Sequence, residues 1–236
     1  MKKLIAAVIV GVILSATPSY ALMIGQMRSA ETSGWGSLNL TAGVGVFENV
    51  KHVFGTVRYG VASQLDLSGS LALLDDEATD DASILFNADA QYQFMQSKFG
   101  WALDMAGGVV FEYFSFGSDN VDASTWTIGL NYIVSKPLKM ENGFAFTPYG
   151  RLNLRSDNFN SDVTVADPVL VSHRTGMAGL SKLLQSQATE SFDNSDFNIG
   201  INVGTLVPIS SKVNLIGELQ IDDQFGFLAG INFFMW

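Results

Sequence analysis

The chain contains no cysteine, few charged residues and no long apolar run beyond its first 21 residues. The lack of cysteine excludes disulfides, thiolate metal sites and a lipid-modified cysteine anchor. Charged residues make up 15% of the chain, whereas a soluble domain carries about 25%. A membrane-spanning helix needs about 20 predominantly apolar residues. Because only such helices and closed barrels cross a membrane, a barrel is the remaining way for this chain to span one.

Basic residues are also scarce. The chain has 13 lysines and arginines against 23 aspartates and glutamates, which gives a formal net charge of −10. Phosphate contacts require a basic surface, so we expect no nucleic-acid partner.

The first 21 residues have the pattern of a secretory signal peptide. Two lysines precede an apolar run over residues 4–14, and small residues surround a tyrosine just before Ala21, as in an A-x-A-like cleavage site. We predict cleavage after Ala21; an uncleaved anchor helix is the alternative, although the run is short for one. Residues 22–34 are predicted to form a short periplasmic segment.

From residue 35 onward, apolar and polar residues alternate with a period of two. In residues 37–46, for example, every second residue is leucine, alanine or valine, while the intervening ones are polar or glycine. Such alternation indicates strands with one apolar face. Ten segments show it: 35–46, 53–61, 65–73, 84–94, 101–112, 125–132, 144–155, 197–204, 213–221 and 225–236.

The number and length of these segments predict an all-β fold: a single antiparallel up-and-down transmembrane β-barrel of about ten strands over residues 35–236. A tilted membrane strand needs about 9–11 residues, and bacterial barrels have even strand numbers. A soluble β-sandwich, which also alternates, is the alternative.

The connections between these segments alternate between short turns and acidic loops. The turns are 62–64, 96–98, 135–143 and 207–212, and the loops are 47–52, 75–83, 115–123, 157–194 and 222–224. This is the pattern of periplasmic turns and extracellular loops. In the long extracellular loop 157–194, apolar residues at helical spacing over 169–184 predict a short helix or cap near the mouth, with a mobile loop as the alternative.

The segment RYGVASQLDL over residues 58–67 resembles the strand–turn–strand units of small outer-membrane barrels, the OmpA/OmpX and opacity-type group. The chain stops at Trp236, shortly after Phe233 and Phe234, which is similar to the C-terminal aromatic end that the barrel-assembly machinery recognises in such proteins. The resemblance implies the outer membrane of a Gram-negative-type bacterium, with the bilayer and outer-leaflet lipid as partners. One departure is that Trp236 does not share the more apolar parity, which runs from Phe227 to Met235.

The residues offer little for catalysis. His52 lies in a predicted loop, and His173 follows Ser172 in the long loop, without the Gly-x-Ser-x-Gly elbow of a serine hydrolase. Omptin-type proteases resemble this chain in strand number, but the Asp-His dipeptide expected from them does not occur. We expect neither an enzyme nor a cofactor.

One acidic loop holds minor candidates for a divalent cation. Carboxylates suit calcium or magnesium, but their spacing here matches no EF-hand loop, so a solvated loop is the interpretation and bridging to lipid phosphates the alternative. The candidates are Asp75, Asp76, Glu77, Asp80 and Asp81.

The polar faces of the strands predict the lining of the lumen. An unpaired charge between low-dielectric walls is costly, whereas paired and hydrogen-bonded charges persist. We therefore predict an ion-pair network, centred on Arg151, that closes or gates the pore; water-exposed lining is the alternative. Its members are Arg58, Arg151, Arg155, Asp66, Asp89, Asp104, Glu112 and Glu218.

These observations favour a narrow or gated pore for small solutes, or an envelope structural protein. A surface adhesin that binds through its loops is the alternative. An outer-membrane enzyme is the least favoured function.

Overall fold

A computed structural model describes residues 26–47, 50–76, 83–118, 121–165, 188–222 and 225–235. Its elements are β1 (Leu38–Phe47), β2 (Val50–Ala62), β3 (Leu65–Asp76), β4 (Ser83–Met95), the 3₁₀-helix η1 (Ser97–Phe99), β5 (Asp104–Ser118), β6 (Val121–Ser135), β7 (Leu138–Lys139), β8 (Ala145–Val165), β9 (Ala188–Ser210), β10 (Val213–Ile221) and β11 (Phe225–Met235). No helix among these described residues is long and apolar enough to cross a membrane.

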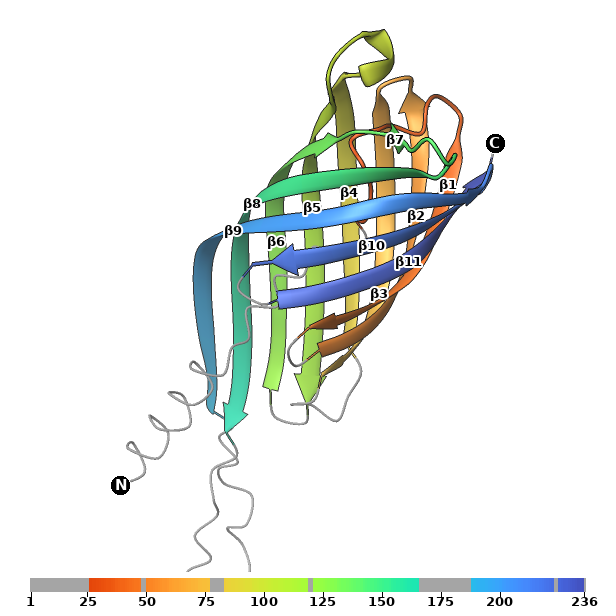
Figure 1. Ribbon diagram of the computed structural model, residues 1–236. Helices are drawn as coiled ribbons and strands as arrows, with labels where there is room; N and C mark the ends of the chain where they lie inside the picture. Colours follow the sequence, from red (N-terminus) through yellow and green to blue (C-terminus); the bar gives the residue numbers. More distant parts are fainter. Residues whose placement is uncertain are drawn as a thin grey trace, which may run out of the picture.

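The strands close into a barrel (Figure 1). Neighbours follow the order β6-β5-β4-β3-β2-β1-β11-β10-β9-β8, and pairing of β6 with β8 completes the ring. All these pairs are antiparallel. The two-residue β7 pairs only with β8, inside a turn, so the wall has ten strands. This confirms the predicted all-β, up-and-down barrel.

The apolar face of each strand points outward. On β2, Val53, Val57 and Tyr59 are exposed, whereas Thr56 and Arg58 between them are buried. The same alternation runs through β4 and β10. Exposed leucines, isoleucines, valines and aromatics on neighbouring strands form an apolar outer surface that far exceeds a single patch of a soluble monomer. A sandwich would bury this face, so the surface belongs against lipid.

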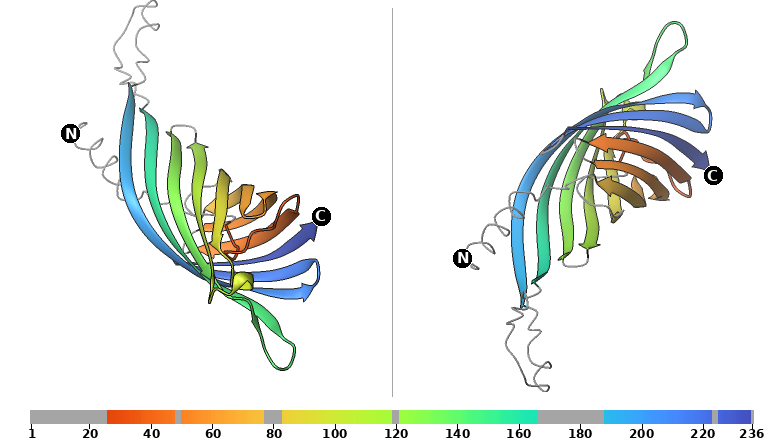
Figure 2. Two further views of the ribbon diagram at one scale, coloured as in Figure 1. Left: turned by 90° about the horizontal axis from the view of Figure 1, so that it is seen from above. Right: turned by 90° about the horizontal axis from the view of Figure 1, so that it is seen from below.

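The strands differ strongly in length at the loop end of the barrel, opposite the tight turns. β8 has 21 residues and β9 has 23, whereas β10 has only 9. β9 pairs with β10 only from Ile201 onward, so the preceding part of β9 extends past β10 together with β8 (Figures 1 and 2).

The predicted loop 157–194 was therefore too long. Pairing of β8 with β9 continues from Asp157 opposite Asp196 to Val165 opposite Ala188. These strand ends are rich in polar residues on both parities, and a strand beyond the membrane needs no apolar face, so alternation does not reveal it. The remaining residues 166–187, which hold the predicted cap and His173, lie outside the described residues.

Other predicted loops also contain strand residues. β2 begins at Val50, so His52 lies in a strand rather than in a loop. β5 continues to Ser118 and β6 begins at Val121, although the sequence predicted a loop over 115–123.

Residues 26–30, which precede β1, lie inside the barrel. Gln26, Met27, Arg28, Ser29 and Ala30 are all buried, with exposed fractions of 7% or less. Residues 22–34 were expected to form a periplasmic segment. In the described part of that range, residues 26–30 lie inside the barrel instead. We call residues 26–34 the N-terminal segment.

A tight reversal allows the N-terminal segment to enter the lumen. Gly34 and Gly36 have φ angles of 83° and 75°, in the left-handed region that favours glycine. The Gly36 amide donates to the Gly60 carbonyl at 2.8 Å. A Cβ atom on Gly60 would lie only 1.8 Å from the Gly34 carbonyl oxygen. The absence of a side chain at position 60 thus leaves the space through which the chain turns.

Candidate functional site

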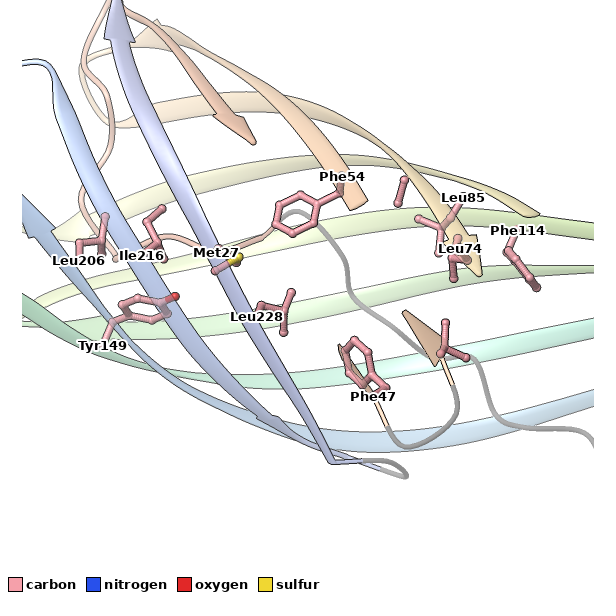
Figure 3. Close-up of a cluster of buried hydrophobic side chains, with 12 residues drawn as sticks. Met27, Phe47, Phe54, Leu74, Leu85, Phe114, Tyr149, Leu206, Ile216 and Leu228 are labelled. Carbon is pink, nitrogen blue, oxygen red and sulfur yellow. The ribbon is translucent and has the colours of Figure 1, made fainter. Parts of the chain in front are cut away.

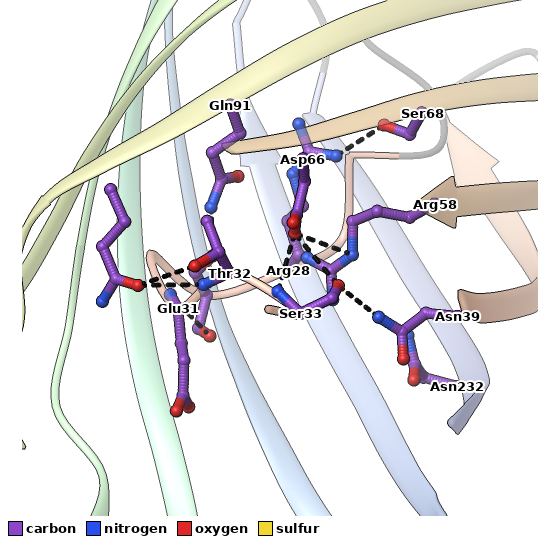
Figure 4. Close-up of polar contacts among 12 residues, drawn as sticks. Arg28, Glu31, Thr32, Ser33, Asn39, Arg58, Asp66, Ser68, Gln91 and Asn232 are labelled. Carbon is purple, nitrogen blue, oxygen red and sulfur yellow. Dashed lines mark hydrogen bonds and ion pairs between the residues drawn. The ribbon is translucent and has the colours of Figure 1, made fainter. Parts of the chain in front are cut away.

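At the turn end of the lumen, the N-terminal segment is bound through Thr32 and Ser33. The Ser33 amide and hydroxyl donate to Asp66 Oδ2 at 2.8 and 3.0 Å (Figure 4). The Thr32 amide and hydroxyl donate to Gln93 Oε1 at 3.1 and 3.0 Å. Arg58 adds an ion pair to Asp66, with 3.6 Å between Nε and Oδ2. The segment therefore uses the lumen-facing side chains of β3 and β4 as hydrogen-bond acceptors.

Deeper in the lumen, Arg28 is the main charged contact of the segment. Its guanidinium forms an ion pair with Asp89 on β4 and donates to Ser68 Oγ on β3 at 2.7 Å. Ser68 in turn donates to Asp89 at 2.5 Å. Arg28 is 3% exposed and Asp89 is 7% exposed. The predicted set of lumen residues did not include Arg28, because this residue precedes the alternating strands. The available signal was that Arg28 is the only basic residue in 22–34.

Arg151 on β8 binds the same segment from another part of the wall, beyond β5 and β6. Its Nη2 donates to the Arg28 backbone carbonyl at 3.3 Å. Its Nη1 lies 3.8 Å from Glu218 on β10, and its guanidinium lies 6.0 Å from the Tyr149 ring. Glu218 also accepts hydrogen bonds from Tyr149 at 2.6 Å and Asn202 at 2.7 Å. Arg151 thus links the wall of β8–β10 to the N-terminal segment.

A separate cluster lies toward the loop end. Arg155 forms ion pairs with Asp157 at 3.0 Å and with Asp222 at 2.5 Å. Asp157 also accepts from Thr127 at 2.5 Å and Asn198 at 2.8 Å. Asp157 and Asp222 were absent from the predicted set because the sequence placed both in loops.

The two remaining predicted carboxylates have polar donors. Asp104 accepts from the Ser97 amide at 2.7 Å, the Ser97 hydroxyl at 2.9 Å and the Gln93 amide at 3.2 Å. Glu112 accepts from Asn87 at 3.3 Å. All eight predicted lumen residues are buried. The structure brings Arg58 to Asp66 and Arg151 to Glu218, with Arg28 joining the Arg151 group to Asp89.

The lumen also has an apolar part, which the sequence did not predict. Near the loop end, lumen positions on β1 to β5 are large and apolar, and all are buried: Phe47, Phe54, Leu74, Leu85 and Phe114. Together with Met27 of the N-terminal segment, they belong to one cluster (Figure 3). The His52 ring stacks on Phe47, with a centroid distance of 5.4 Å, and contacts the Phe54 ring in a tilted arrangement at 5.7 Å. With Met27 of the N-terminal segment in place, this apolar filling excludes water and ions from that part of the lumen.

The described residues show no metal site among the acidic-loop candidates. Asp75 is exposed on β3, and Asp76 ends that strand. Glu77, Asp80 and Asp81 lie outside the described residues. In the part of the chain that is described, no three metal-ligating side chains gather into a possible metal site.

Comparison with known proteins found no matching family model and no matching curated protein. Among solved structures, the chain is similar to the N-terminal β-barrel domain of OprF from Pseudomonas aeruginosa, at 13% identity over 86% of this chain and 99% of that one, with a TM-score of 0.38. It is similar to Ail, the attachment invasion locus protein of Yersinia pestis, at 13% identity over 85% and 99%, with a TM-score of 0.38. It is also similar to the KdgM porin, at 8% identity over 83% and 98%, with a TM-score of 0.37.

Proposed function

We propose that this protein is an outer-membrane barrel that acts as a gated pore, with the N-terminal segment as its plug. One observation carries the proposal. Arg28 of the segment is bound through its side chain by Asp89 and through its backbone carbonyl by Arg151. The two partners lie on β4 and β8, which are separated by β5 and β6 in the wall, so the segment is held by two separate parts of the barrel.

The way in which the segment is bound suits a plug that can leave. Among the described residues, the hydrogen bonds of residues 26–33 involve side chains, and none joins their backbone to a strand backbone. Withdrawal therefore breaks no strand ladder, and the barrel wall keeps its own pairing. Elements with few backbone hydrogen bonds open at low free-energy cost relative to a paired strand.

The proposal includes the cellular setting. Cleavage after Ala21 would place the segment at the start of the mature chain, with only four residues ahead of Gln26. A chain end can withdraw from a lumen without threading a loop. The turn end would face the periplasm, the apolar outer surface would contact the bilayer and outer-leaflet lipid, and the barrel-assembly machinery would insert the barrel through its C-terminal aromatic end. Small solutes would pass when the plug leaves.

Planar-bilayer recording of the purified full chain tests this function. We expect rare, brief openings from the wild type and frequent openings from Arg28→Gln, which removes the charge that Asp89 binds. Heat-dependent gel migration verifies that each barrel is folded. Silence from both proteins, with folded barrels, would leave an envelope structural role and contradict the pore.

A second function, binding of a surface partner, is favoured by the part of β8 and β9 that extends beyond β10. Strands outside the bilayer offer a rigid support for a binding surface. Cells that carry the protein should then adhere to an immobilised partner more than cells without it. Removal of residues 166–187 should abolish this difference without affecting conductance.

A further inference from the structure

We propose that the open pore selects cations over anions, an inference that rests on the gating function proposed above. It concerns the charge that remains on the barrel wall once the N-terminal segment has left.

The charged side chains buried on the wall are mainly acidic. Within the described residues they are six carboxylates and three guanidiniums, which gives the wall a formal charge of −3. The carboxylates are Asp66, Asp89, Asp104, Glu112, Asp157 and Glu218, and the guanidiniums are those of Arg58, Arg151 and Arg155. The segment carries Arg28, the fourth buried arginine, and Glu31, which is exposed, so its departure removes one buried positive charge from the lumen.

The positive charges on the wall already have acidic partners. Arg58 pairs with Asp66, Arg151 with Glu218, and Arg155 with two aspartates, Asp157 and the half-buried Asp222. Each arginine is therefore offset locally. Asp89 is different, because its ion pair is to Arg28 of the segment itself.

Asp89, Asp104 and Glu112 lie on two neighbouring strands. Asp104 begins β5, Glu112 lies eight residues further along it, and Asp89 lies on β4, two residues from the partner of Glu112. At about 3.3 Å per residue, Asp104 and Glu112 are separated by roughly 26 Å along the strand. We call these three residues the carboxylate stripe. It extends from the turn end toward the loop end along one side of the lumen.

A row of carboxylates in a narrow, low-dielectric channel attracts cations along its length. Such walls focus the field and raise the local counter-ion concentration, and acidic side chains line the selective regions of many cation channels. Small inorganic or organic cations are thus the solutes that fit the opened lumen, whereas chloride and acidic solutes are repelled.

Reversal potentials of the full chain with Arg28→Gln, recorded under a KCl gradient, test the inference. This substitution changes the plug and leaves every wall charge in place. We expect potassium to permeate about tenfold better than chloride. Adding Asp89→Asn and Glu112→Gln should bring the permeability ratio close to one. Asp75→Asn, which removes an exposed carboxylate from the outward face of β3, should leave the ratio unchanged.

The outcomes separate the two proposals. A channel that opens but prefers chloride, or shows no preference, overturns cation selectivity and leaves the gate intact. If Arg28→Gln does not fold, a Thr32→Ala and Ser33→Ala double variant loosens the segment without altering wall charge, because it removes the hydroxyl bonds to Gln93 and Asp66 and leaves only the amide bonds. Silence from every folded unlocking variant overturns the gate, and cation selectivity with it.

Discussion

The side chain of Arg151 donates a hydrogen bond to the backbone carbonyl of Arg28 at 3.3 Å, across 123 positions of sequence. Arg151 belongs to the wall and Arg28 to the N-terminal segment. The hydrogen bond therefore exists only while the N-terminal segment is in the lumen. Since it engages a backbone atom, no substitution at position 28 removes it directly, and Arg151 is the residue to change.

Replacing Arg151 with alanine should increase the frequency of channel openings. The change removes the bond to the segment and also leaves Glu218 without its cation. In planar bilayers we expect Arg151→Ala to open more often than the wild type. Arg155→Ala is the matched control, since Arg155 is equally buried but binds Asp157 and Asp222 near the loop end. Equal activity of wild type and Arg151→Ala would remove Arg151 from the gate.

Trypsin should distinguish the closed and open positions of the segment. Arg28 is buried, so the folded wild type should resist cleavage after this residue. In Arg151→Ala, the segment should spend more time outside the lumen. Trypsin should then cut after Arg28, and mass spectrometry would detect the shortened chain. Cleavage at the exposed Lys98 reports protease access in both proteins. Rapid cutting after Arg28 in the folded wild type would place the segment outside the lumen.

Gly60 should be needed for the segment to enter. A methyl group at this position would lie 1.8 Å from the Gly34 carbonyl oxygen, whereas nothing lies within 4 Å of a Cβ on Gly217. We therefore expect Gly60→Ala to expel the segment and raise conductance. Gly217→Ala, on a strand of the same barrel, should behave like the wild type. The hypothesis fails if both alanine variants keep Arg28 resistant to trypsin.

The outer surface should respond to charge according to its depth in the membrane. Leu130 is 56% exposed near the middle of β6, and Ile209 is 58% exposed near the turn end of β9. Arginine at a lipid-facing midplane position costs about 2–4 kcal/mol, falling to about 0–1 kcal/mol near the interface. Leu130→Arg should thus lower the free energy of unfolding in lipid far more than Ile209→Arg. Equal costs, or wild-type protein found soluble after cell fractionation, would contradict the membrane placement.

The barrel could be predicted from the sequence because a membrane strand shows its environment in every second residue. Val53, Val57 and Tyr59 face lipid whatever lies inside, so alternation alone identifies β2. The lumen charges followed from the same parity, which placed Arg58, Arg151 and Glu218 on the inner face.

The N-terminal segment could not be found in this way. Its residues show no alternation, and its contacts join positions far apart in sequence, such as Arg28 and Asp89, 61 residues apart. The apolar cluster of Phe47, Phe54 and Leu74 was equally hidden, because a lumen is polar when water fills it and can be apolar when side chains fill it. The ends of β8 and β9 were read as loop because both of their faces are polar.

A reversible covalent lock tests the plug most directly. The Ala30 amide donates to Ser135 Oγ at 3.1 Å, and the chain has no native cysteine. Cysteines at positions 30 and 135 would therefore form the only disulfide, joining the segment to β6. In an Arg151→Ala background, bilayer recordings should show a silent channel after oxidation and frequent openings after reduction. Openings that persist while the disulfide is intact would show that the N-terminal segment does not close the pore.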